Sequence, residues 1–147
     1  MYSTILWATD ASAESDAALQ VAVDLLEPDG TLYAFHCDQR FLGGRMSGAP
    51  VLPDEDDRRR HIDAQVHELR ATGIDAQERF ELTHHDPAHE IARLAGELQV
   101  EVIVCGTRAL HGLGSIGGST ASRLLKQAPV PVIVVPPRAH TRELATT

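Results

Sequence analysis

Long apolar runs and cysteine are both scarce in this sequence of 147 residues, and each shortage excludes a class of protein. The longest apolar runs, such as Val130 to Val135, are far shorter than the roughly 20 residues that a membrane-spanning helix needs. The two cysteines, Cys37 and Cys105, form neither a disulfide framework nor a zinc signature. Each cysteine lies inside or at the end of an apolar run, which favours core packing over a redox role.

Basic residues are outnumbered by acidic ones, 13 to 21, which gives a net charge of −8, and Lys126 is the only lysine among them. No basic stripe with interleaved aromatic residues is present, so we expect no nucleic-acid binding. An acidic chain does not attract anions by its overall field, so any anionic ligand has to be held by local geometry. The N-terminal residues lack a basic region ahead of an apolar stretch, and we therefore expect a cytoplasmic protein without membrane attachment.

Strand-like apolar segments alternate with helical stripes along the chain, a pattern that is typical of α/β proteins. Asp75–Thr83 alternates weakly, which suits a half-exposed edge strand. Pro131 opens the last apolar run, which places that strand at an edge as well. The repeated order predicts a doubly wound, five-stranded parallel sheet of Rossmann-like type, with helices on both faces, in a single domain covering residues 1–147. The predicted strands cover 5–8, 31–37, 75–83, 102–105 and 132–135.

Capping residues mark where the predicted helices begin and end. Ser12, followed by an acidic first turn, begins the first helix, and Pro28-Asp29-Gly30 ends it. Asp86-Pro87 combines a capping carboxylate with proline at the first helical position. In the short helix before the last strand, the residues expected to face inward are Ala121, Leu124 and Leu125.

A glycine-rich segment runs from Gly106 to Thr120, between a predicted strand and a predicted helix. Glycines let backbone amides approach an anion closely, and the helix that starts near Gly118 points its positive end at the segment. Ser119 and Thr120 add hydroxyl donors. The segment therefore favours a phosphate site, although Gly118-Ser119 could also simply cap a helix after a flexible loop.

Two better-known phosphate motifs are matched only in part by this segment. Residues 112–117 satisfy the GxGxxG pattern, but they do not directly follow a strand, and no acidic residue ends a strand about 20 residues later. Residues 112–119 resemble a P-loop in which Gly118 replaces the lysine. These differences argue against an NAD site and against the activity of a P-loop NTPase.

Asp10, Cys37 and Gly106 fall at the carboxyl ends of predicted strands, where α/β sheets bind their ligands. Asp10 has three interpretations: contact with a nucleoside, capping of the following helix, or action as a general base. Arg108 either contacts a phosphate or pairs with an acidic neighbour.

A second cluster of polar residues surrounds the start of the helix at Asp86-Pro87. His85 and His89 have the spacing of paired metal ligands on one helix face, with His84 beside them. Because Pro87 makes His85 precede the helix, the two side chains need not share a face. We therefore favour a solvated loop over a metal site.

Several of these segments together resemble the universal stress protein family. That family carries Gly, two residues, Gly, nine residues, then Gly followed by Ser or Thr, between its last two strands. Gly106 matches the first glycine and Gly118-Ser119 match the final pair, whereas Ala109 replaces the second glycine and only eight residues follow it. The similarity extends over nearly the whole chain, through Thr9-Asp10-Ala11-Ser12, His36-Cys37, the helix start at 86–91 and the closing segment at 128–135.

The resemblance implies a site for ATP or another adenine nucleotide, with or without Mg, and a homodimer formed through Val132–Val135. It implies that Asp10 contacts the nucleoside and that Cys37 lies against adenine through its backbone. Ribose and phosphates are expected against the glycine-rich segment. The full set of expected nucleotide-binding residues is Ala8, Asp10, Cys37, Cys105, Gly106, Arg108, Ala109, Gly118, Ser119 and Thr120.

Three functions are compatible with these observations. The first is a nucleotide-binding regulatory or stress-response protein. The second is a dimeric interaction module of the same fold, in which Ala109 and the shortened loop have closed the site. The third is a slow ATPase or small-molecule hydrolase that uses Asp10, because a fold alone does not determine activity.

Overall fold

The computed structural model describes residues 1–39, 55–83, 86–107 and 120–136. Within these ranges the chain alternates strictly between strands and helices. The strands are β1 (Tyr2–Ala8), β2 (Leu26–Gln39), β3 (Asp75–Thr83), β4 (Val102–Gly106) and β5 (Val132–Val135). The helices are α1 (Ala13–Leu25), α3 (Glu55–Ala71), α4 (Pro87–Leu98) and α5 (Thr120–Gln127).

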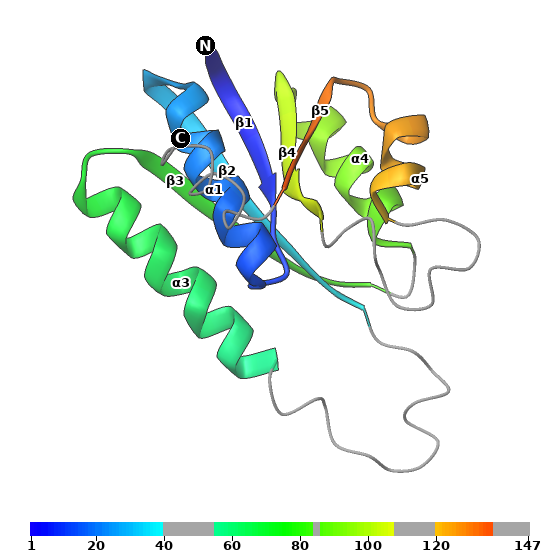
Figure 1. Cartoon of the computed structure of the whole chain (residues 1–147), viewed down its shortest axis with the longest axis horizontal. Helices are drawn as coiled ribbons and strands as arrows, with labels where there is room; N and C mark the ends of the chain where they lie inside the picture. Colours follow the sequence, from blue (N-terminus) through cyan, green and yellow to red (C-terminus); the bar gives the residue numbers. More distant parts are fainter. Residues whose placement is uncertain (40–54, 84–85, 108–119, 137–147) are drawn as a thin grey trace, which may run out of the picture.

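The five strands form one parallel sheet in the order β3-β2-β1-β4-β5 (Figure 1). Strand order reverses between β1 and β4, and the carboxyl ends of the strands point to the bottom of Figure 1. β3 and β5 are the edge strands, as the sequence predicts. The predicted Rossmann-like architecture is therefore confirmed, and it puts the switch in strand order where ligands bind in such sheets.

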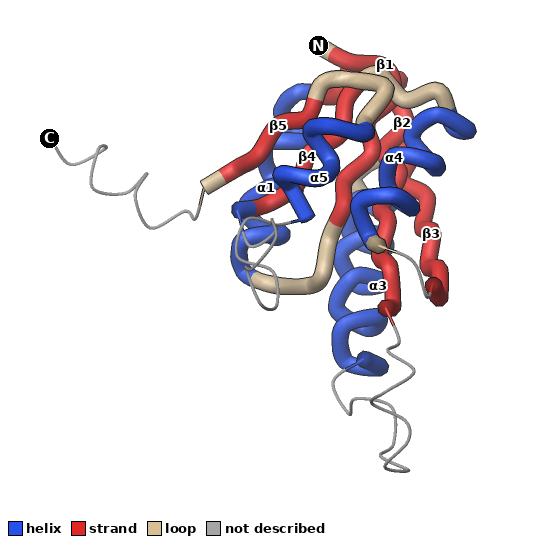
Figure 2. The backbone as a smooth tube through the Cα atoms, turned by 90° about the vertical axis from the view of Figure 1, so that its right-hand side faces the viewer, coloured by secondary structure: helices blue, strands red, loops and turns tan. Residues whose placement is uncertain are grey.

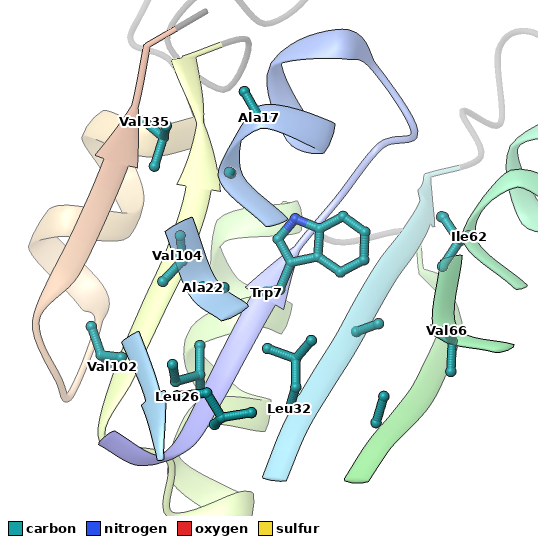
Figure 3. Packing of buried hydrophobic residues seen from close by; sticks show 14 residues of the cluster. Trp7, Ala17, Ala22, Leu26, Leu32, Ile62, Val66, Val102, Val104 and Val135 are labelled. Atoms are coloured by element: carbon teal, nitrogen blue, oxygen red, sulfur yellow. The ribbon is translucent and has the colours of Figure 1, made fainter. Parts of the chain in front are cut away.

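Side chains alternate between the two faces of the sheet, and a different pair of helices covers each face. On one face, α1 and α3 pack over Ile5, Trp7 and Leu32; Figure 3 shows the indole of Trp7 beneath α1. On the other face, α4 and α5 pack over Leu6 and Phe35, and Figure 2 shows these two helices on the same side of the sheet. Because both faces are covered, Ile5 to Trp7 of β1 and Val102 to Val104 of β4 are fully buried.

The capping signals in the sequence begin the helices as predicted. The hydroxyl of Ser12 accepts from the backbone N–H of Ser15 at 3.2 Å, and the carboxylate of Asp86 accepts from Ala88 at 3.2 Å. Gly73, with φ of 94°, follows the end of α3. No helix in the described ranges is long and apolar enough to cross a membrane.

Two expectations about element boundaries and faces were wrong. Residues 28–30 do not end the first helix; α1 ends at Leu25 and these residues already belong to β2. A step from Tyr2 to Thr4 on β1 faces a step from Leu26 to Thr31 on β2, so an irregular register absorbs the turn-like residues within the strand.

Leu125 does not face inward, because 59% of it is exposed, whereas Ala121 and Leu124 are buried. Successive helical residues are about 100° apart, so a helix of eight residues buries one narrow stripe, and Leu125 lies beside it.

Candidate functional site

The carboxyl ends of β1, β2 and β4 meet at the switch in strand order. Ala8, the last residue of β1, pairs with Phe35 on one side and with Cys105 on the other. Asp10 and Cys37 are partly exposed beside this point, whereas Ala8, Cys105 and Gly106 are buried. The structure therefore brings five of the predicted site residues to one edge of the sheet.

The other predicted site residues belong to the glycine-rich segment and its helix. Thr120 is the first residue of α5 and is partly exposed. The remaining four, Arg108, Ala109, Gly118 and Ser119, lie outside the described residues.

The loop between β1 and α1 is held by its own side chains. Oδ1 of Asp10 accepts from the backbone N–H of Ser12 at 2.9 Å and from the hydroxyl of Ser15 at 2.8 Å. Between them Ala11 has a φ of 65°, a left-handed conformation that residues other than glycine rarely adopt. Its N–H donates to Oγ1 of Thr9 at 3.0 Å. Asp10 thus organises the start of α1, and its contact with a nucleoside stays a prediction.

Gly106 ends β4 directly against the first turn of α1. A Cβ atom at this position would lie 2.4 Å from the carbonyl oxygen of Glu14 and 2.9 Å from the backbone nitrogen of Ser15. The indole Nε1 of Trp7 on β1 donates to the carbonyl of Ser15 at 2.9 Å, so the sheet also holds the first turn of α1 through this hydrogen bond. Glycine at 106 is required for this close approach of strand and helix.

A buried polar pair lies next to the loop. His36 on β2 and Glu55 on α3 are only 2% and 6% exposed. Nδ1 of His36 lies 2.9 Å from the carbonyl oxygen of Thr9, and Nε2 lies 2.8 Å from Oε1 of Glu55. Nε of Arg59 is 3.7 Å from the same carboxylate, and its guanidinium lies over the ring of Phe80. This pair connects β2, α3 and the end of β1.

The two cysteines at this edge differ in their surroundings. Cys105 is 3% exposed, and burial raises the pKa of its thiol to about 11. It is therefore uncharged at neutral pH and packs as a small apolar side chain, as the sequence predicts. Cys37 is partly exposed, and both thiols are free of disulfides.

The start of α4 is joined to α5 by an ion pair. Nε of Arg123 lies 2.7 Å from Oδ2 of Asp86, whose other oxygen caps α4. Among the described residues no group of three or more histidine, cysteine, aspartate or glutamate side chains could hold a metal ion. His84 and His85 lie outside those residues, so the predicted preference for a solvated loop is not tested by them.

Sequence reasoning did not assign a buried polar contact to His36, Glu55 or Ser15. A histidine within an otherwise apolar strand is a signal that a buried polar contact exists, because an unpaired polar side chain is costly to bury. The partner could not be found, since Glu55 is separated from His36 by 19 positions and no periodicity relates them.

Comparison with known proteins agrees with this geometry. The model of the universal stress protein family matches residues 1–136. The chain belongs to the universal stress protein family. The predicted membership is thereby confirmed. Among curated proteins none matches this universal stress protein significantly.

Solved structures share the fold of this universal stress protein at low sequence identity. The universal stress protein UspA from Lactobacillus plantarum is 24% identical with a TM-score of 0.70, and the match covers 91% of this chain and 97% of that one. A universal stress protein in complex with cAMP is 21% identical with a TM-score of 0.63, covering 91% and 97%. A family protein from Arabidopsis thaliana with AMP bound is 14% identical with a TM-score of 0.61, covering 95% and 94%.

Proposed function

We propose that this universal stress protein binds an adenine nucleotide at the carboxyl ends of β1, β2 and β4. The observation that carries the proposal is the meeting of Asp10, Cys37 and Gly106 at the switch in strand order. Gly106 also opens the glycine-rich segment that ends at Thr120, the start of α5. Two structures of the same fold support the proposal, one in complex with cAMP and one with AMP bound.

The proposed ligand is ATP or another adenylate, with or without Mg. Asp10 contacts the nucleoside, the backbone at Cys37 lies against adenine, and the glycine-rich segment surrounds the phosphates through backbone N–H groups and the hydroxyl of Thr120. The protein acts as a single cytoplasmic domain with a regulatory or stress-response role. Nucleotide occupancy is then its signal, without a requirement for turnover.

The first experiment identifies whatever small molecule the purified protein releases on denaturation. Mass spectrometry is expected to find an adenine nucleotide in near-stoichiometric amount, and calorimetry with added ATP is expected to give a binding signal. Neither a released nucleotide nor a calorimetric signal would contradict the proposal.

Two matched variants test the role of Asp10 without removing its loop contacts. In Asp10→Asn the remaining side-chain oxygen can still accept from Ser12 and Ser15, but the negative charge is lost. We expect ATP affinity to fall about tenfold, the size of one hydrogen bond to a charged group. Asp75→Asn is the control, because it makes the same change at the opposite end of the sheet. There Asp75, at the start of β3, accepts from the hydroxyl of Thr31. Equal affinities of the two variants would remove Asp10 from the site.

We also propose that β5 forms a homodimer interface. Among the strands that the structure describes, β5 pairs with β4 alone, and Val132, Ile133 and Val134 are partly exposed. An unpaired apolar edge is an aggregation hazard unless another chain covers it. A solution mass at micromolar concentration is expected to correspond to a dimer, and a monomer would contradict the interface.

A dimeric interaction module without nucleotide is the second candidate. It is favoured by the contacts of Asp10, whose Oδ1 is already occupied by Ser12 and Ser15. Ala109 in place of a glycine favours it as well. This candidate predicts a dimer that releases no nucleotide and gives no calorimetric response to ATP.

A further inference from the structure

The side chain of His36 makes two polar contacts, whereas the side chains of Ala34 and Phe35 just before it belong to the apolar clusters of the core. Ala34, two positions earlier on the same face of the sheet, is fully buried among apolar side chains. The ring of His36 is as well buried but lies between the carbonyl of Thr9 and the carboxylate of Glu55. Burying a polar pair has a desolvation cost that an apolar side chain of similar volume avoids. The pair therefore calls for a role beyond filling space.

The chemistry of the two contacts fixes the orientation of the ring. A backbone carbonyl can only accept, so Nδ1 carries a proton and donates it to Thr9. Nε2 and Oε1 of Glu55 then hold one proton between them at 2.8 Å. Glu55 thereby fixes the tautomer and the ring plane, and Nδ1 is directed at Thr9.

The carbonyl of Thr9 belongs to the peptide that joins Thr9 to Asp10. The backbone N–H of Thr9 itself donates to the carbonyl of Phe35 on β2 at 2.9 Å, and the hydroxyl of Thr9 accepts from the N–H of Ala11. The loop that carries Asp10 is thus attached to the protein through Thr9. His36 also immediately precedes Cys37, whose side chain packs with the opposite face of the sheet. One ring therefore lies beside the ends of β1 and β2, two of the three strand ends that the proposed nucleotide site uses.

We infer that His36 is a positioning residue of the proposed site: its Nδ1–H fixes the peptide before Asp10, and Glu55 fixes the ring. The inference rests on the proposed function, because it names a determinant of the same site. His36 acts through Thr9 and Asp10 and need not touch the ligand.

Two amide variants separate the contacts of the ring. The amide nitrogen of His36→Asn reproduces the position of Nδ1 and can still donate to Thr9. The amide nitrogen of His36→Gln reproduces Nε2 and can still reach Glu55. By calorimetry with ATP we expect His36→Asn to stay within about threefold of the wild type and His36→Gln to lose about tenfold or more, the value of one hydrogen bond at the site.

A second pair of variants leaves the ring in place and changes its partner. The amide of Glu55→Gln can donate to Nε2 of the neutral imidazole, so the ring orientation and the affinity for ATP are expected to be kept. Glu55→Leu leaves Nε2 without a partner and is expected to weaken ATP binding as His36→Gln does. Urea unfolding of all four variants shows whether each one is folded. This pair decides the inference if the substitutions at 36 do not fold.

Hydrogen exchange in the nucleotide-free protein gives a readout that does not depend on the ligand. The amides of Ala11 and Ser12 donate to Thr9 and Asp10, so their protection reports how well the loop is held. We expect protection to fall in His36→Gln and to persist in His36→Asn.

The outcomes are distinguishable from failure of the proposed function. Wild-type protein that shows no response to ATP contradicts the nucleotide site itself, whatever the variants do, and the inference falls with it. If the wild type binds ATP and His36→Gln binds as tightly, the positioning role is overturned. It is also overturned if both amide variants lose affinity equally while the loop amides stay protected.

Discussion

The polar groups at the two ends of the sheet differ in how deeply they are buried. At the amino end, Oε1 of Glu101 accepts from the backbone and hydroxyl of Ser3 and from the backbone of Thr4, and all three residues are solvent-accessible. At the carboxyl end, several polar side chains around the partly exposed Asp10 are buried. Between β1 and α3 the buried polar residues are Thr9, Ser15, His36 and Glu55.

This difference indicates that the carboxyl end of the sheet has a role beyond folding. An exposed polar group can replace a lost protein hydrogen bond by one to water at little cost in free energy. A buried polar group cannot, so it needs every hydrogen-bond partner in place. A chain that only had to close its sheet could have used apolar residues at both ends. The buried contacts at the carboxyl end converge on the β1–α1 loop, which carries Asp10.

The largest effect is expected where the backbone itself leaves no room at the carboxyl end. In Gly106→Ala the new Cβ would lie 2.4 Å from the carbonyl oxygen of Glu14. Because a backbone atom cannot rotate away, we expect a loss of about 3 kcal/mol in the free energy of unfolding, the upper part of the range for overpacking. Urea denaturation measures it.

Gly96 in α4 offers the matched control for the same change. A Cβ there meets only Pro129, at an ordinary 3.9 Å. Gly96→Ala is therefore expected to stabilise the protein by about 0.5–1 kcal/mol, the difference in helix propensity. If the two alanine variants had the same stability, the close approach of β4 and α1 would not be important for the fold.

The next effect concerns the fifth buried polar residue, Glu90, in the first turn of α4. Arg93 donates to Glu81, Glu90 and Glu97, and its hydrogen bond is the main cause that lowers the pKa of Glu90. Arg93→Met leaves a buried carboxylate without this partner. Since Arg93 itself is 36% exposed, we expect a loss of about 2 kcal/mol at pH 7, less than for a fully buried pair.

The pH dependence of this loss has a definite sign. A lowered pKa means that Glu90 contributes stability above its ordinary value of 4.5, and that this contribution disappears as the pH falls through the lowered value. The gap between wild type and Arg93→Met should therefore shrink in acid. Arg60→Met is the control, because the pair of Arg60 with Asp57 is more than 70% exposed and is expected to contribute almost nothing. A gap that does not change with pH would assign the effect to lost packing of the arginine stem.

Much of this architecture could be predicted because local patterns determine it. Apolar runs such as Val102–Cys105 specify buried strands, and Asp86-Pro87 begins a helix through its own side chain and ring. Both signals act within a few residues, so no knowledge of the tertiary structure was needed.

Apart from Leu125, the errors and omissions came from contacts between distant segments. Residues 28–30 are turn-like in composition, yet the register of β2 against β1 keeps them in a strand. The pairing of His36 with Glu55 depends on how α3 packs over β2, which no local pattern encodes. The candidate site was located through the strand ends and its glycines, but the side chains that hold its loop were not.

A smaller effect is expected between the two ends, where α3 packs on β3. Partial burial, together with a hydrogen bond to Asp63, raises the pKa of Glu78 to about 7. The folded protein therefore holds this proton more tightly than the unfolded chain, so stability falls as the pH rises from about 4.5 through 7. Glu78→Gln removes that loss and should stabilise by about 1 kcal/mol at pH 8.5, after allowance for solvent screening, with little change at pH 5.

Thermal unfolding over this pH range tests the assignment to Glu78. Asp63→Asn should flatten the profile only in part, because it removes the negative charge and the carboxyl hydrogen bond of Asp63 but leaves the burial that is the largest cause of the raised pKa of Glu78. Equal stabilisation by Glu78→Gln at pH 5 and pH 8.5 would show that ionisation of this carboxyl group is not the cause.

The sharpest comparison of the two ends uses one backbone conformation that occurs at both. Ala11 follows β1 with a φ of 65°, and Gln99 caps the last turn of α4 with a φ of 54°. Glycine adopts this left-handed conformation without the strain of a Cβ. Both Ala11→Gly and Gln99→Gly are therefore expected to change the free energy of unfolding only slightly, with a gain of about 0.5 kcal/mol, because relief of strain exceeds the extra entropy of the unfolded chain.

The two glycine variants should differ in binding although they agree in stability. Ala11 lies between Asp10 and Ser12 in the loop of the proposed site. A glycine there increases the number of conformations that the loop can adopt in the nucleotide-free protein. ATP affinity is expected to fall by about threefold in Ala11→Gly, a cost of preorganisation, and to be unchanged in Gln99→Gly. Equal affinities in calorimetry would mean that the strained alanine serves the start of α1 alone, and that the two ends of the sheet differ in burial but not in function.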